Sequence, residues 1–148
     1  MRHGQAHAQA SRDELRPLTE LGAAQVYENA SRHLNNINFD WVFVSPYLRA
    51  QQTFNQAKAA GLQFIQSQTV SWVTPDVPTI PALDQLSFIK TDNLNILIIC
   101  HQTFAGRLAT HLCEGSQQGM HVDTAAIVKI ETEVFASQCG ILQHVYCV

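Results

Sequence analysis

The segment that most restricts how this chain can fold is the run from Ile96 to Cys100, in which every residue is apolar. A strand with one face in water alternates apolar and polar residues, whereas a parallel strand covered by helices on both faces is apolar throughout. The run is also far shorter than the roughly 20 residues needed to cross a bilayer. We therefore predict a central parallel strand between two layers of helices.

The segments before this run show the same alternation of strands and helices. Residues 39–44 are aromatic and β-branched and stop at Ser45, as expected of a strand. A helix is predicted before it, from the N-cap Thr19 to about residue 36, and another after it, from about residue 47 to 60, which Gly61 ends. Residues 62–66 form a further candidate strand.

The second half of the chain continues the pattern less clearly. The Pro-rich residues 72–81 are predicted to be a loop. Helices are expected over residues 82–90 and 103–113, and strands over residues 124–130 and 141–148, the last two as a possible hairpin. Alternating strands and helices predict a three-layer α/β/α sandwich with a mostly parallel sheet, and 148 residues fit one domain.

Composition excludes several classes of protein. The chain is 46% hydrophobic, which excludes intrinsic disorder, and its formal net charge of −3 without a basic block argues against nucleic-acid or anionic-membrane partners. No apolar leader follows Met1, so we expect a cytoplasmic protein. The four cysteines are widely spaced and are expected to be free thiols, with no metal or other cofactor.

Ligands of such sheets bind outside the carboxyl ends of the strands, and arginines and histidines lie at these positions. Arg49 follows the strand at residues 39–44, His101 follows Cys100, and Arg2-His3-Gly4 opens the chain. The planar donors of arginine match phosphate oxygens, and an unprotonated histidine can attack phosphorus without a metal. We therefore predict a phosphoryl-transfer site, although residue types alone do not decide which histidine is the nucleophile.

Four sequence blocks resemble the histidine phosphatase superfamily, which includes the cofactor-dependent phosphoglycerate mutases and the small bacterial SixA-type phosphohistidine phosphatases. They occur in the family's order over nearly the whole chain. The blocks are Arg2-His3-Gly4 with Gln5-Ala6, Arg16-Pro17-Leu18-Thr19 with Gly22, Ser45-Pro46-Tyr47-Leu48-Arg49-Ala50 through Gln52-Thr53, and Ile98-Ile99-Cys100-His101. One block alone would be a weak signal, but the four together are specific.

The resemblance implies a role for each matching residue. His3 would accept the phosphoryl group, Arg2 and Arg49 would bind it, and His101 would stabilise the transition state from the opposite side. Arg16 would be a further phosphate ligand at the edge of the site. Gly4 and Ser45 complete the expected substrate-binding set. The histidines without a matching motif are expected to be structural or surface residues: His7, His33, His111, His121 and His144.

The chain departs from the family pattern in two ways. In relatives the Arg-His-Gly tripeptide ends an apolar strand, but here only Met1 precedes it, so we expect a truncated first strand and a true start upstream. No general acid is evident either; Asp76, in a turn beside proline, is the best candidate. An alkoxide leaving group needs such an acid more than the imidazole of phosphohistidine does.

These departures favour protein phosphohistidine as the substrate, with a histidine-containing phosphotransfer domain as the partner. A chain of 148 residues also leaves little to roof a pocket around a small metabolite. Two alternatives stay open: a phosphomonoesterase or mutase acting on small molecules, and a phosphate-binding interaction module without catalysis.

Overall fold

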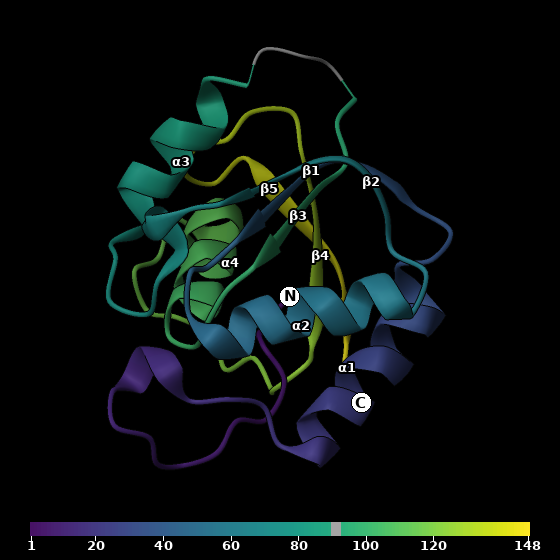
Figure 1. Cartoon of the computed structure of the whole chain (residues 1–148). Helices are drawn as coiled ribbons and strands as arrows, with labels where there is room; N and C mark the ends of the chain where they lie inside the picture. The colour runs from purple at the N-terminus through teal and green to yellow at the C-terminus, as the bar shows by residue number, and fades with distance from the viewer. Residues whose placement is uncertain (90–92) are drawn as a thin grey trace.

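The computed structural model describes residues 1–89 and 93–148, and its strands form two sheets (Figure 1). The first is parallel, with the order β2-β1-β3, and the second is an antiparallel pair. The strands are β1 (Asn38–Val44), β2 (Gln63–Thr69), β3 (Ile96–Ile99), β4 (Ile127–Thr132) and β5 (Gly140–Tyr146). The late hairpin predicted from the sequence corresponds to β4 and β5.

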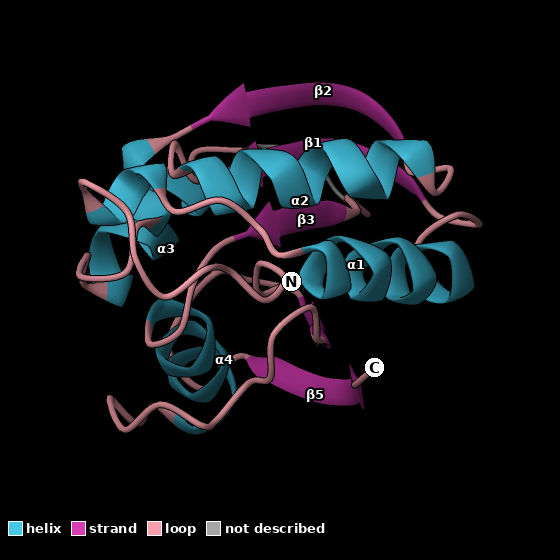
Figure 2. Ribbon diagram, turned by 60° about the horizontal axis from the view of Figure 1, so that its bottom comes forward, coloured by secondary structure: helices cyan, strands magenta, loops and turns pink. Residues whose placement is uncertain are grey.

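Helices cover both faces of the parallel sheet, which confirms the predicted three layers (Figure 2). They are α1 (Glu20–His33), α2 (Leu48–Ala59), α3 (Thr79–Ser87) and α4 (Phe104–Glu114), with short 3-10 helices η1 (Asp13–Leu15) and η2 (Ser71–Val73). Alternate side chains of β1 separate two hydrophobic clusters: Val42 and Val44 pack with α1 and α2, while Phe43 packs with α3 and α4.

Two predicted boundaries are wrong. The Pro-rich loop predicted over residues 72–81 contains part of η2, and α3 begins within it at Thr79, because proline is tolerated in the first turn of a helix. The predicted end of that helix, Lys90, lies outside the described residues. Strand β2 runs to Thr69, beyond its predicted end, because its backbone pairs with β1 as far as Val44 although its side chains are mostly exposed and polar.

Residues 1–3 lie against the end of β3 and hold the start of the chain in place. Arg2 forms a parallel bridge with Cys100, and the backbone N–H of His3 donates to the Cys100 carbonyl at 2.9 Å. On the other side, the N–H of Arg2 donates to the carbonyl of Ala126 at 3.0 Å. The short segment therefore joins the two sheets, although its pairing covers too few residues to count as a full strand.

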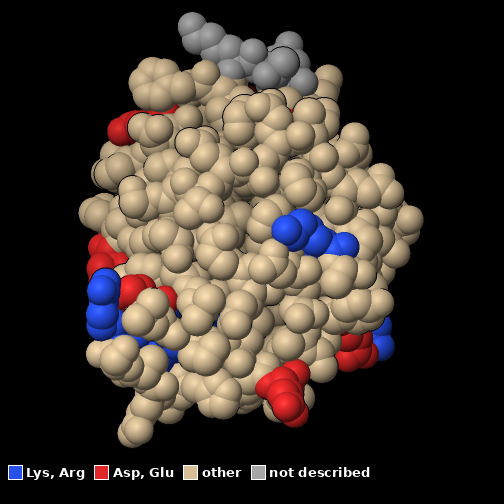
Figure 3. Space-filling view, in the orientation of Figure 1, with Lys and Arg blue, Asp and Glu red and all other residues tan. Residues whose placement is uncertain are grey.

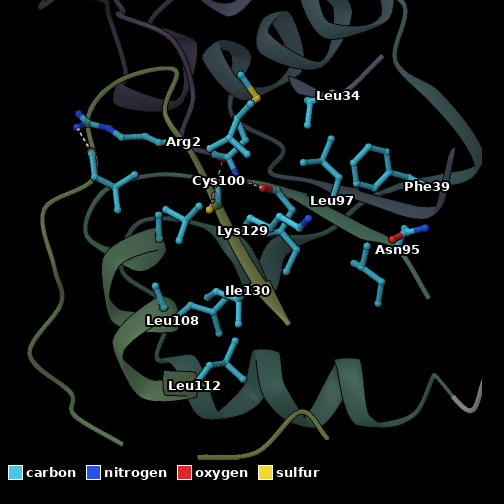
Figure 4. A pocket seen from close by; sticks show the side chains of 18 of the residues that line it. Arg2, Leu34, Phe39, Asn95, Leu97, Cys100, Leu108, Leu112, Lys129 and Ile130 are labelled. Atoms are coloured by element: carbon cyan, nitrogen blue, oxygen red, sulfur yellow. Dashed lines mark hydrogen bonds between the residues drawn. The ribbon is translucent and has the colours of Figure 1, made fainter. Parts of the chain in front are cut away.

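A cavity of about 260 Å³ lies beside this segment, between β3 and β4 (Figure 4). Leu97 of β3, Leu108 and Leu112 of α4 and Ile130 of β4 contribute to its apolar lining. Of the predicted site residues, only Arg2 borders it. The cavity is therefore a gap in the packing between the two sheets and is separate from the predicted phosphate site.

The surface carries few charges. In the view of Figure 3 most of the exposed side chains are uncharged; acidic and basic ones adjoin at the left and lower right margins, and a basic one lies alone right of centre, so this face has no basic patch. Within the described residues, no helix combines the length and the apolar character that a membrane span requires.

Candidate functional site

Two histidines and a serine from separate segments meet at the carboxyl ends of the strands. His3 follows the bridge between Arg2 and Cys100, Ser45 directly follows β1, and His101 lies two positions after the end of β3. The ring centroids of His3 and His101 are 5.0 Å apart, and His101 Nε2 lies 2.6 Å from Ser45 Oγ. All three side chains are buried. The sheet thus brings together residues that are up to 98 positions apart, from His3 to His101.

The hydrogen bonds of His3 fix which ring nitrogen carries a proton. Nδ1 lies 2.7 Å from the carbonyl oxygen of Gly4, and because a carbonyl only accepts, Nδ1 must be the donor. Nε2 receives a hydrogen bond from Arg49 Nε at 3.2 Å, which requires a lone pair on Nε2. The nitrogen that faces the arginine is therefore the basic, nucleophilic one.

Both imidazoles are neutral at pH 7. Burial, with a smaller contribution from the Arg49, Arg2 and Arg16 guanidinium groups, lowers the pKa of His3 to about 4, although the bond to Gly4 opposes this shift. Burial, followed by repulsion from His3 in its protonated form and from the Arg49 guanidinium group, lowers the pKa of His101 to about 2. A neutral imidazole at position 3 keeps its lone pair available for attack.

Arg49 places its guanidinium group next to His3 Nε2. It lies in the first turn of α2, because the chain leaves β1 at Ser45 and turns directly into the helix. Only 3% of its side chain is exposed, and its guanidinium carbon lies 4.8 Å from the centroid of the Tyr47 ring. The aromatic face restrains the guanidinium group beside His3. A phosphoryl group at His3 would therefore meet a fixed positive charge.

Asp13 contacts both Arg49 and Arg16, although the sequence analysis did not single it out. Its carboxylate accepts from Arg49 Nη2 at 3.0 Å and from Arg16 Nε at 2.7 Å. Burial acts to raise the pKa of Asp13, but the hydrogen bonds from these two arginines outweigh it and hold this pKa below its usual range. The carboxylate is therefore charged at pH 7. It links Arg16 to the group around His3.

Arg2 and Gly4 flank His3 on the chain. Arg2 Nη1 donates to the carbonyl of Val122 at 2.7 Å, while its buried Nε has no partner among the described residues. The N–H of Gly4 donates to Thr53 Oγ1, and a side chain at position 4 would meet the carbonyl of Gly22. Gly4 therefore allows close packing of α1 in this structure, and its N–H is already satisfied.

Asp76, the candidate general acid, lies in the segment between η2 and α3. It is exposed in a turn, and within the described residues no hydrogen bond or ion pair joins it to His3, Arg49 or His101. Of the remaining histidines, His111 is buried 2.7 Å from Thr79 Oγ1, between α3 and α4, and the exposed His121 pairs with Asp123.

Two positioning residues were not predicted from the sequence. Thr53 Oγ1 donates to the carbonyl of Arg49 and accepts from the N–H of Gly4, so one hydroxyl connects α2 to the segment that carries His3. The sequence signal for it was its place in the third matching block. Asp13 had a weaker signal: an acidic residue three positions before Arg16.

The arrangement can bind and transfer a tetrahedral anion. His3 Nε2 has an oriented lone pair, and Arg49 provides positive charge next to it in a buried site, where charge stabilisation is strongest. In phosphoryl transfer, positioning and electrostatic stabilisation of the equatorial oxygens supply most of the catalysis.

Comparison with known proteins identifies relatives of this chain. A sequence model described as the histidine phosphatase superfamily (branch 1) matches residues 1–70. The phosphohistidine phosphatase SixA homolog of Haemophilus influenzae is 31% identical over 121 residues, which are 76% of this chain and 74% of that protein. Phosphohistidine phosphatase SixA of Escherichia coli K12 is 30% identical over 138 residues, 88% of this chain and 81% of that protein.

Comparison with solved structures finds a similar fold. The solved structure of the protein histidine phosphatase SixA complexed with tungstate is similar to this chain with a TM-score of 0.86 and 24% sequence identity. The match covers 99% of this chain and 94% of that one. The similarity confirms the predicted phosphoglycerate mutase-like α/β fold over the whole length.

Proposed function

The chain belongs to the histidine phosphatase superfamily, and from this premise we propose that it removes the phosphoryl group from protein phosphohistidine through a covalent intermediate on His3, without a metal. The observation that carries the proposal is the pair of bonds that leaves a lone pair on His3 Nε2 beside Arg49 Nε. The two curated relatives, both named phosphohistidine phosphatases, support the substrate class.

The reaction takes place in two displacements at phosphorus. His3 Nε2 uses its lone pair to form a bond to phosphorus, the phosphorus–nitrogen bond of the substrate breaks, and the departing imidazole keeps that electron pair and takes up a proton from solvent. A water molecule then attacks phospho-His3 and gives up a proton to solvent, the bond to Nε2 breaks with its electron pair returning to Nε2, and inorganic phosphate leaves. Arg49, Arg2 and His101 are assigned to stabilise charge on the phosphoryl oxygens in both steps.

The carboxylates of the site support this substrate over alkyl phosphates. Protonation of an alkoxide leaving group requires a general acid close to the reacting atoms, and members of this superfamily that act on such substrates usually place a Glu or Asp there. Asp13 is held as a charged carboxylate by two arginines, and Asp76 is exposed in its turn. Imidazole leaves more readily than an alkoxide once it is protonated, so a phosphoramidate can react without a dedicated acid.

The test uses a histidine-containing phosphotransfer domain carrying phosphohistidine as substrate. We expect phosphate release by the wild-type chain to continue in excess EDTA, and an acid-labile phosphoenzyme to accumulate when the reaction is quenched early. His3→Ala should abolish both signals, because the nucleophile is gone. The matched control His144→Ala removes an exposed histidine of β5 and should behave as the wild type.

Two results would reject the proposal. Loss of turnover in EDTA that zinc or magnesium restores would reject the metal-independent mechanism. Phosphate binding by the wild type without turnover or phosphoenzyme would favour the non-catalytic interaction module.

A further inference from the structure

One carboxylate joins the two arginines at the edge of the site. Asp13 opens η1 in the loop between His3 and α1, and it contacts Arg49, 36 positions later, and Arg16, three positions later. Its two side-chain oxygens are divided between them: Oδ2 accepts from Arg49 Nη2 at 3.0 Å and Oδ1 accepts from Arg16 Nε at 2.7 Å. Its backbone carbonyl also accepts from Arg49 Nη1 at 2.7 Å.

These bonds orient the Arg49 guanidinium group. Asp13 holds the edge formed by Nη1 and Nη2, so the remaining Nε–H points toward His3 Nε2 at 3.2 Å. A guanidinium group is planar, and fixing one edge fixes the direction of the others. Without the Asp13 carboxylate the Arg49 group would keep the Tyr47 ring, His3 Nε2 and the backbone carbonyl of residue 13 as neighbours, but Nη2 would lose the charged partner that restrains rotation of the guanidinium group.

The exposure of the two partners differs from that of a surface ion pair, in which both side chains are exposed. The Arg49 side chain is 3% exposed, whereas the Asp13 side chain is 55% exposed. Exposed pairs such as Arg12 with Glu14 add little to stability. A partly exposed carboxylate that reaches a buried guanidinium beside the nucleophile instead fixes geometry where the reaction occurs.

We propose that Asp13 is the positioning residue that sets the direction of the Arg49 guanidinium group and brings Arg16 to the same phosphoryl group. The inference rests on the proposed function and deepens it. Asp13 itself carries a negative charge and therefore does not bind the phosphate. It acts through the two arginines, so its loss should slow the chemical step more than it weakens substrate binding.

The test compares Asp13→Asn with the wild type and with Glu14→Gln. Asparagine keeps the shape and one acceptor oxygen but cannot serve both arginines. Glu14→Gln is a matched control, because it removes the neighbouring carboxylate of η1, whose bonds go to Arg12. Misplacement of a reacting group by about 1 Å costs roughly 100-fold in rate, so we expect kcat on phosphohistidine to fall at least about 10-fold in Asp13→Asn with KM changed less than about threefold.

A purely structural role would give different results. If Asp13 only anchored the loop, Asp13→Asn would lower the melting temperature and the folded fraction while the folded enzyme kept its kcat. A kcat within about twofold of wild type, or a rise in KM alone, overturns the proposal. Glu14→Gln should leave both constants unchanged.

A second readout separates this proposal from the proposed function. In arginine-selective ¹⁵N spectra, a guanidinium group held on both Nη atoms should give separate Nη signals, which merge when rotation is free. We expect separate Arg49 signals in the wild type and in Glu14→Gln and merged signals in Asp13→Asn. If the wild type does not hydrolyse phosphohistidine, the proposed function fails, and these spectra still decide whether Asp13 holds Arg49. Separate Arg49 signals in Asp13→Asn would overturn the proposal that Asp13 orients Arg49.

Discussion

His3 and His101 are two neutral imidazoles enclosed beside a guanidinium group, and this environment has a consequence for stability. In the unfolded chain a histidine takes up a proton near pH 6.5. In the folded chain, burial lowers the pKa of His3 to about 4 and that of His101 to about 2. At a pH between the unfolded and the folded pKa values, the unfolded state binds more protons than the folded state, so protonation favours unfolding.

We therefore predict that the free energy of unfolding decreases as the pH falls from about 6.5 toward 4. Urea denaturation at pH 7.0, 6.0 and 5.0 measures this dependence. His3→Ala removes one of the two depressed titrations and should give a shallower decrease, while the control His144→Ala should match the wild type. An equal slope in His3→Ala and wild type would contradict the low pKa assigned to His3.

At the scale of elements, β3 and β4 face each other across a gap that residues 1–3 fill only at one end. Met1 donates from its terminal amino group to the carbonyl of Ile98 at 2.7 Å, and burial lowers the pKa of this group. The cavity of about 260 Å³ continues along the two strands from there (Figure 4). Apolar residues that extended this segment backward would pair with β3 and fill the cavity. The upstream start expected from the sequence stays a prediction.

Extending the chain before Met1 tests whether the gap between β3 and β4 can accept a strand. We predict that Ile-Val-Ile-Val added before Met1 raises the melting temperature by about 4 °C or more over Gly-Ser-Gly-Ser added at the same place, because each fully buried side chain contributes about 1.5–3 kcal/mol against the entropy of ordering it. Both extensions replace the buried ammonium group of Met1 by an amide. The difference between their melting temperatures therefore measures the strand pairing and burial of the added residues. Equal melting temperatures would show that the gap does not accept a strand.

At the scale of the whole molecule, helices cover both faces of the parallel sheet and the candidate site lies at one end of that sheet. Within the described residues, the carboxylate bonded to the site arginines is the charged Asp13, and Asp76 lies exposed in a turn. Sugar phosphates, the substrates of the small-molecule alternative, have alkoxide leaving groups that need a proton donor.

We predict that kcat/KM for sugar phosphates lies at least about 100-fold below that for a phosphorylated phosphotransfer domain, since general acid catalysis contributes roughly that factor. Steady-state phosphate release with both substrates measures the ratio. Comparable turnover of sugar phosphates, abolished in Asp76→Ala, would establish the small-molecule alternative and assign Asp76 as its acid.

The sequence alone determined the layered fold, because the apolar run ending at Cys100 and the signals at Thr19 and Gly61 are local consequences of burial and backbone geometry. Residue type and motif also identified His3 and Arg49 as candidate site residues. Only the tertiary structure decided which imidazole nitrogen of His3 is basic and that Asp13 holds Arg49, because these depend on contacts between distant segments. The direction of a side chain is set by the partners that folding brings to it, and no local pattern in the sequence records them.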